Sequence, residues 1–332
     1  MKIKKKYYGT TSQGEKVTLY TLTNSNGISL EIINYGGIIT KLFFPDNKGV
    51  LGNIVLGYDN LKYYEDNQPF FGAIIGRYAN RIKDGSFKID KVKFNIDKNN
   101  GNNHLHGGFS GFHKKVWTAK SIERKDSLSL ILNLLSKDLE GGFPGNLETT
   151  VHYTLNNDNE LEIKYFAKTD KKTIVNFTNH SYFNLGSSLN KDIFNHKLLL
   201  KANKYLEVNS DLIPTGKLLS VERTKFDFLN SNKLSSELDH CWVLDNYLKE
   251  KIELAAVLVN EKTGRKIEVY TDEPGIQVYT GNNLDFKHKK NSGICLETQH
   301  FPNSPNQPNF PSTELLPGEV YKSNTIIKLI NT

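Results

Sequence analysis

The sequence predicts an all-β protein, a large antiparallel β-sandwich with few short helices. Alternating or β-branched runs recur along nearly the whole chain, and no long stretch keeps the 3.6-residue period of a helix. Turn residues separate these runs, and no Gly/Ser-rich or Pro-rich linker divides them. We therefore expect residues 1–332 to form a single domain in which two large sheets pack face to face.

The expected strands are runs that alternate apolar and polar side chains or that are rich in β-branched residues. In chain order they are 15–22, 28–36, 37–44, 87–96, 128–135, 148–155, 160–168, 173–179, 196–202, 252–260, 265–272, 275–281, 293–299 and 325–330. Helical pieces are expected only at 60–67 and 235–239. The Pro- and Asn-rich segment 300–312 is expected to be a structured loop, because its two phenylalanines, Phe301 and Phe310, need a place to pack.

Composition excludes several classes of protein. The formal charge is +7, but the lysines are spread along the chain and form no basic stripe, so no nucleic-acid partner is expected. No apolar run approaches the length of a membrane span, and no apolar stretch follows the N-terminal lysines as in a secretory signal. Two cysteines, Cys241 and Cys295, are too few for a disulfide framework, which favours a cytoplasmic location. Two glycosylation acceptor patterns start at Asn176 and Asn179.

One short stretch, FTNHSYFNLG at 177–186, carries a histidine among amides and aromatic residues. As a strand it would place Thr178, His180 and Tyr182 on one face, and neither face reads as a clean core. A buried histidine satisfied by its neighbours is the ordinary interpretation. Whether His180 instead has a chemical role depends on which other polar residues the chain provides.

Other segments also place polar groups where a plain sandwich would have apolar ones. These groups are Asn80 and Arg81 in FGAIIGRYANRI, His104 and His106 in NNHLHGG, Asp239 in ELDHCWVL, and Gln277 in PGIQVYTGN. Each one alone is explained by a turn, a surface ion pair or an exposed face. Glu297 in GICLETQ is harder to explain in this way, because a carboxylate in a buried strand is costly without a partner or a task.

Metal and nucleophile chemistry are disfavoured by spacing. His104 and His106 lack a third ligand at zinc or iron spacing, and GxSxG and phosphate-binding loops are absent. We therefore expect no catalytic metal. Imidazoles, carboxylates and neutral amides remain, a set suited to sugar hydroxyls and to proton transfer.

In order along the chain, the segments GRYANRI, NNHLHGG, VNFTNHSYFNL, PTG, DHCWVL, PGIQVYTGN and LETQHFPNSPNQPNFPSTELLPGEVY resemble the motifs of the galactose mutarotase (aldose 1-epimerase) family. The resemblance covers nearly the whole chain. It implies a β-sandwich with an open sugar cleft and cofactor-free interconversion of the α and β anomers of free hexoses such as galactose and glucose.

The resemblance also implies roles for individual residues. His180 becomes the general acid and Glu297 the general base, and the sugar contacts fall on Asn80, Arg81, His106, Asp239 and Gln277. His104 is not carried over. We expect Arg81 and His106 to donate to the anomeric oxygen, and Tyr182 or Trp242 to lie against an apolar face of the ring.

Mutarotation needs two proton-transfer groups, one for the anomeric hydroxyl and one for the ring oxygen. We expect an ionised Glu297 to take the first proton and a protonated His180 to supply the second, with Asn179, Ser181 and Asn184 fixing the loop around the imidazole. A non-catalytic carbohydrate-binding or regulatory protein of the same fold is the alternative, and the joint presence of His180 and Glu297 argues against it. A sister enzyme for hexose 6-phosphates would need a cationic cluster, and only Arg81 is a candidate. The partner is an aldohexose, and the expected assembly is a monomer or a homodimer.

Overall fold

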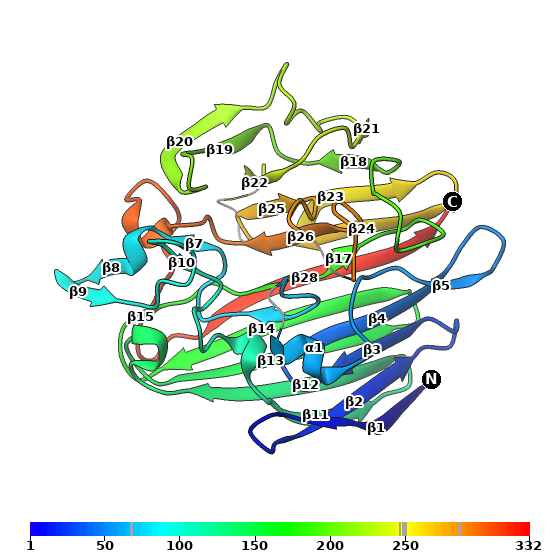
Figure 1. Cartoon of the computed structure of the whole chain (residues 1–332), viewed down its shortest axis with the longest axis horizontal. Helices are drawn as coiled ribbons and strands as arrows, with labels where there is room; N and C mark the ends of the chain where they lie inside the picture. Colours follow the sequence, from blue (N-terminus) through cyan, green and yellow to red (C-terminus); the bar gives the residue numbers. More distant parts are fainter. Residues whose placement is uncertain (67–68, 246, 248–250, 285–286) are drawn as a thin grey trace.

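The computed structural model describes residues 1–66, 69–245, 247, 251–284 and 287–332. Within these residues the strands form three large sheets and four two-stranded ones, and every pairing between named strands is antiparallel. The expected all-β sandwich is confirmed. Figure 1 shows the N-terminal strands β1–β5 (blue) below, β25 and β26 (orange) above, and β28 (red) crossing between them.

The five-stranded sheet has the order β1 (Lys2–Thr10), β2 (Lys16–Thr23), β3 (Ser29–Ile33), β4 (Ile38–Pro45), β5 (Leu51–Asn53). The nine-stranded sheet has the order β11 (Thr118–Glu123), β12 (Ser127–Ser136), β13 (Leu147–Asn156), β14 (Glu160–Thr169), β28 (Tyr321–Asn331), β24 (Arg265–Thr271), β23 (Glu253–Asn260), β18 (Lys197–Leu200), β21 (Asn232–Lys233). The six-stranded sheet has the order β17 (Tyr182–Phe183), β26 (Ile294–Gln299), β25 (Gly275–Tyr279), β22 (Asp239–Val243), β19 (Lys204–Val208), β20 (Pro214–Ser220).

The two-stranded sheets pair β6 (Ile74–Ile75) with β16 (Thr178–Asn179), β7 (Arg81–Ile82) with β10 (His104–Leu105), β8 (Ser86–Ile89) with β9 (Val92–Asn95), and β15 (Thr173–Ile174) with β27 (Glu314–Leu315). The helical elements are α1 (Leu61–Asp66) and the 3₁₀ turns η1 (Lys83–Gly85), η2 (Phe112–Lys114), η3 (Glu140–Gly142) and η4 (Ser304–Asn306). No helix among the described residues is long and apolar enough to cross a membrane.

The five-stranded and six-stranded sheets meet, and together they face the nine-stranded sheet. Val55 forms a β-bridge with Phe183, and the Leu56 N–H donates to the Tyr182 carbonyl at 2.9 Å, which joins the end of the five-stranded sheet to β17. One buried cluster contains Leu30 of β3, Leu130 of β12 and Val278 of β25, all fully buried. Alternate apolar residues of the three sheets therefore fill one core between two layers.

Local structure differs from the expectation at residues 235–239 and 87–96. The helix expected at 235–239 is wrong, because Asp239 instead begins β22 and pairs with Tyr279. The strand expected at 87–96 is a hairpin, whose turn residues Asp90 and Lys91 have φ of 48° and 70°. The helix expected at 60–67 is confirmed as α1, with residue 67 outside the described part of the chain.

The loop 300–312 packs as expected. Phe301 and Phe310 are buried, and their ring centroids lie 5.2 Å apart in an edge-to-face contact. This loop follows β26 directly, so its packing also fixes the end of the strand that carries Glu297.

Candidate active site

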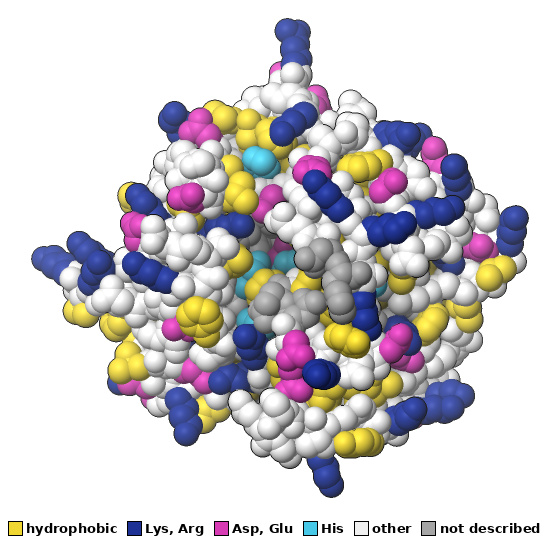
Figure 2. Space-filling view, viewed as in Figure 1, with side chains coloured by type: hydrophobic (Ala, Val, Ile, Leu, Met, Phe, Trp, Pro, Cys, Tyr) yellow, Lys and Arg dark blue, Asp and Glu magenta, His cyan; other side chains and the backbone are white. Residues whose placement is uncertain are grey.

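A cavity of about 370 Å³ opens above β22, β25 and β26, within the size range of small-ligand sites. Figure 2 shows a hollow near the centre of one face in which histidine and acidic side chains come together. All eight residues predicted for the site line this cavity: Asn80, Arg81, His106, His180, Tyr182, Asp239, Gln277 and Glu297. The structure thus brings together residues from distant parts of the chain, while the role of each stays a prediction.

The floor of the cavity is a grid of alternate residues on three paired strands. Residues that pair across neighbouring strands point to the same face of a sheet. The first row is Asp239, Tyr279 and Cys295, and the second row is Cys241, Gln277 and Glu297. Of these six, the two cysteines are buried and do not line the cavity. This register places two carboxylates and an amide on one surface.

Trp242 does not reach the cavity, so the expectation that it could lie against the sugar is wrong. It follows Cys241 in β22 and pairs with Ile276, so it points to the core side of the sheet. It is fully buried, and its Nε1 donates to the Phe226 carbonyl at 3.0 Å. The alternation of β22 therefore excludes an aromatic contact from this residue.

Glu297 carries a buried carboxyl group, and one of its two oxygens accepts no hydrogen bond from the described residues. It is 2% exposed, and its Oε2 has no hydrogen-bond partner among the described residues. Burial raises the pKa of Glu297 well above its ordinary value, and the nearby charge of Asp239 raises it further, while Arg81 opposes both. A buried acid with one oxygen left unpaired by the described residues is suited to exchanging a proton with a ligand.

His180 lies across from Glu297, in a break between β16 and β17 rather than in one continuous strand. Its Nε2 is 3.7 Å from Glu297 Oε1, and its Nδ1 is 3.5 Å from Cys295 Sγ. Burial lowers the pKa of His180 to about 4. Burial thus favours the uncharged imidazole and the protonated carboxyl, which differs from the expected ionised Glu297 and protonated His180.

The polar neighbours of His180 fix its loop as expected. The Asn179 amide donates to the Gly72 carbonyl at 2.9 Å and accepts from the Ser181 hydroxyl at 2.6 Å. Asn184 donates to the carbonyls of Lys191 and Ser292. These bonds hold the backbone on both sides of the imidazole.

Asn80 is the last residue of the loop between β6 and β7, and Arg81 is the first residue of β7. Asn80 has a φ of 65°, and its Oδ1 accepts from the Arg81 N–H at 2.8 Å. Arg81 Nη2 lies 3.6 Å from Asp239 Oδ2, and its Nε donates to Asn100 at 3.3 Å. The guanidinium therefore enters the cavity already paired with one acid.

His106 offers the cavity an N–H donor. Its Nδ1 accepts from the Asn80 main-chain N–H at 3.2 Å, and burial together with the neighbouring His180 keeps its pKa well below the ordinary value. A neutral ring that accepts through Nδ1 carries its proton on Nε2. Ligand atoms of His106, His180 and Glu297 lie within 4.8 Å of one another, but this tautomer suits a sugar oxygen better than a metal ion.

His104 has a structural role, in agreement with its exclusion from the predicted site. It is fully buried, its Nδ1 bonds the Asp97 carbonyl at 2.8 Å, and its ring packs on Phe143. Gly107 then makes the close turn after His106, with a φ of 85° and with the Gly76 oxygen only 1.8 Å from where a Cβ would lie.

Gln277 and Asp239 hold each other. Gln277 Nε2 donates to Asp239 Oδ1 at 2.6 Å, so the Asp239 carboxylate receives an amide on one oxygen and faces Arg81 with the other. Such a clamped carboxylate is placed to accept from sugar hydroxyls.

Sequence reasoning missed several lining residues, including Phe70, Asn100 and Tyr279. Tyr279 could have been found, because it lies two residues after Gln277 in a strand and so shares its face. No sequence pattern indicated that Phe70 would line the cavity. It has a φ of 61°, and its ring centroid lies 4.8 Å from that of His106 and 5.6 Å from that of His180.

Comparison with known proteins gives consistent matches. The family model described as aldose 1-epimerase matches residues 18–328. The chain is 41% identical to a galactose mutarotase of Bos taurus, with 92% of each chain covered, and 35% identical to an aldose 1-epimerase of Escherichia coli K12, with 96% of each covered. The structure of a galactose 1-epimerase from Lactobacillus acidophilus superposes with a TM-score of 0.87 at 28% identity, covering 99% of both chains.

Proposed function

Because this chain belongs to the aldose 1-epimerase family, we propose that it interconverts the α and β anomers of free hexoses such as galactose and glucose. The observation that carries the proposal is the 3.7 Å approach of His180 Nε2 to Glu297 Oε1 inside the cavity. The ring oxygen and the anomeric oxygen of a pyranose are both bonded to C1. Two proton-exchanging atoms this close together can therefore serve both oxygens of one sugar.

Glu297 acts as the base and His180 as the acid in ring opening. The carboxylate takes the proton of the anomeric hydroxyl, the C1–O5 bond breaks as the C1 carbonyl forms, and the imidazolium protonates the ring oxygen. The aldehyde then rotates about C1–C2 and closes on its other face, with the two roles exchanged. No proton is consumed over the cycle.

The pair carries one proton in total. Burial favours that proton on Glu297, because it raises the pKa of the carboxyl and lowers the pKa of His180. Hydrogen bonds from sugar hydroxyls stabilise the charged forms, so a bound sugar brings the pair to the ionised carboxylate and the imidazolium. Arg81 and the N–H of His106 stabilise negative charge on the anomeric oxygen.

The cavity suits an uncharged sugar. Arg81 is the only lysine or arginine among the described lining residues, and it already faces Asp239 at 3.6 Å. Because Asp239 already balances the charge of Arg81, a phosphate group would meet no uncompensated positive charge in the cavity. This supports free hexoses over hexose 6-phosphates.

We further propose that the chain works as one domain in the cytoplasm, as a monomer or a homodimer, without a metal or a cofactor. Its two cysteines are buried and unlinked, as in a reducing compartment.

Polarimetry of freshly dissolved α-D-galactose and α-D-glucose tests the proposal directly. The purified protein is expected to bring the rotation to equilibrium many times faster than buffer alone. Decay at the buffer rate for both sugars, with protein shown to be folded by circular dichroism, would refute it.

A further inference from the structure

The loop that carries Asn80 and leads into Arg81, the first residue of β7, is not shaped by an extended sheet. Residues 76–80 lie between β6 and β7, which have two residues each. Such a loop keeps one conformation only if other parts of the chain hold it. One anchor is Arg77, which donates to the Ser136 carbonyl at 2.9 Å and to the Pro144 carbonyl at 3.1 Å.

A second anchor is Asn176, which is fully buried. Its main chain donates to the Arg77 carbonyl at 3.0 Å and accepts from the Ala79 N–H at 2.8 Å. Its side-chain amide donates to the carbonyls of Ala79 and His300, both at 3.2 Å, and accepts from the His300 N–H at 2.9 Å. Asn176 therefore joins the loop to the residue that follows β26, and in the folded protein it is inaccessible to glycosylation.

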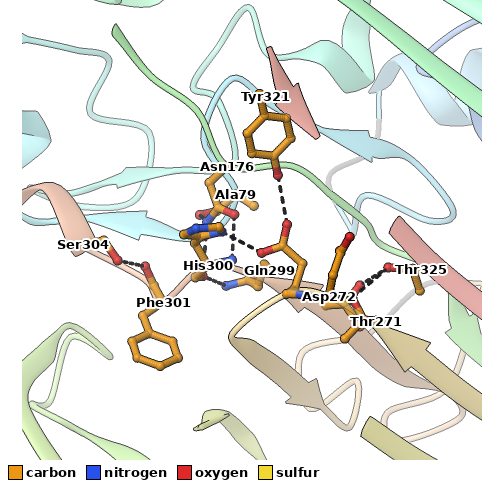
Figure 3. A network of polar contacts seen from close by, with 12 residues as sticks. Ala79, Asn176, Thr271, Asp272, Gln299, His300, Phe301, Ser304, Tyr321 and Thr325 are labelled. Atoms are coloured by element: carbon orange, nitrogen blue, oxygen red, sulfur yellow. Dashed lines mark hydrogen bonds and ion pairs between the residues drawn. The ribbon is translucent and has the colours of Figure 1, made fainter. Parts of the chain in front are cut away.

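His300 is in turn held by a buried carboxylate. Its Nδ1 lies 2.6 Å from Glu273 Oε2, and Tyr321 donates to Glu273 Oε1 at 3.0 Å. Figure 3 shows Ala79, Asn176 and His300 close together near the centre of this network, with Tyr321 above them. Glu273 is 2% exposed, and although burial opposes its charge, His300 and the hydroxyl donors outweigh burial and keep the pKa of Glu273 below its ordinary value.

A buried ion pair contributes little net stability, because desolvation offsets most of the attraction. Neither Glu273 nor His300 lines the cavity, so the proton transfer does not use them. Their contacts join the turn before β25, the end of β26 and the start of β28 to the Asn80 loop. The contacts of Glu273 and His300 therefore fix the position of the loop that carries Asn80.

We propose that Glu273 and His300 are positioning residues that act through Asn176 to hold Asn80 and Arg81 against the sugar. The inference rests on the proposed function. Glu297 and His180, which move the protons, lie outside this loop, and His106 also stabilises the anomeric oxygen. A loosened loop therefore weakens the sugar contacts of Asn80 and Arg81 more than it slows the chemical step.

The test compares Glu273→Gln with Glu268→Gln. Glu268 is a matched control on β24, since it also accepts from a cation and a tyrosine, Lys266 at 2.9 Å and Tyr270 at 2.8 Å, but it has no bond to the loop. We expect Glu273→Gln to raise KM for galactose about tenfold and to lower kcat less than about threefold. Glu268→Gln is expected to leave both within about twofold of wild type.

A second pair of variants covers the case in which Glu273→Gln does not fold. His300→Gln removes the cation at a partly exposed position and is expected to raise KM, and His300→Lys is expected to recover part of the loss by restoring a cation beside Glu273. Galactose affinity measured by calorimetry should fall in parallel with the rise in KM.

The inference is overturned if wild type is active and the folded Glu273 or His300 variants keep wild-type KM and galactose affinity. It is also overturned if kcat alone falls, or if Glu268→Gln has the same effect. An inactive wild type would instead refute the proposed function, so the two failures are distinguishable.

Discussion

His180 Nε2 lies 3.7 Å from Glu297 Oε1, although 117 positions separate the two residues in the numbering, 180 and 297. Both side chains are nearly inaccessible to solvent, and the other ring nitrogen of the imidazole, Nδ1, lies 3.5 Å from the thiol of Cys295. Burial makes the pair sensitive to small changes in charge and geometry.

Replacing Glu297 with Gln should remove the base while keeping the shape of the side chain. We expect kcat to fall by about 10²–10⁴-fold with KM changed little, since a positioned acid–base group contributes about that factor. Polarimetry on galactose measures the effect. Glu261→Gln, at an exposed ion pair with Lys197, is the control, and a Glu297→Gln enzyme with wild-type kcat would show that another group is the base.

Activity should be lost in acid as the pair takes up a second proton. Because burial lowers the pKa of His180 to about 4, the imidazole accepts this proton only as the pH falls through about 4. Below that point both groups are protonated and no base remains, so kcat/KM is expected to decline there. A loss of activity centred near pH 6.5, with the fold intact by circular dichroism, would contradict the lowered pKa.

The alkaline limit should depend on Asp239. The charge of Asp239 raises the pKa of Glu297 beyond the effect of burial, so Asp239→Asn should lower that pKa. The pair then loses its shared proton at lower pH, and the alkaline limb of kcat/KM is expected to shift to lower pH than in wild type. Gln277→Glu adds a carboxylate next to Asp239 and Glu297 and should shift the limb the other way. Superimposable alkaline limbs in all three enzymes would argue against this coupling.

A methyl group at Gly107 should destabilise the fold. The added Cβ would lie 1.8 Å from the Gly76 oxygen, next to the loop of Asn80, and the φ of 85° is itself unfavourable for alanine. We expect Gly107→Ala to lower the free energy of unfolding by more than about 3 kcal/mol. Gly14→Ala is matched to it, with a φ of 86° and open space around the Cβ, so its loss should be about 1 kcal/mol. Equal losses in urea denaturation would show that backbone conformation, rather than the clash, decides.

Strand periodicity predicted the sheets well because alternation is a local property of the chain. The run 275–281 appears as β25, and the run 160–168 appears as β14. The helix expected at 235–239 failed because pairing of Asp239 with Tyr279 overrides the local preference.

The candidate site could be assembled from the sequence only through the resemblance to a family, since Asn80 and Glu297 reach one cavity through long-range pairing. The position of Trp242 was predicted wrongly, because the residues of β22 alone do not show which face of the strand points to the cavity. The Glu273–His300 pair gave no local signal at all, since its partners lie on different strands. Protonation states were also out of reach, because they depend on burial by the whole fold.

The grid on β22, β25 and β26 limits how this pocket can change. Deleting one residue upstream in β25 would move Gln277 among the packed hydrocarbons and push Val278 out beneath the sugar. New ligand preferences can therefore arise by exchange at every second position, or in the bordering loops, but hardly by insertion within these strands. The alternation of side chains along these strands therefore also determines which positions can be substituted without disturbing the core.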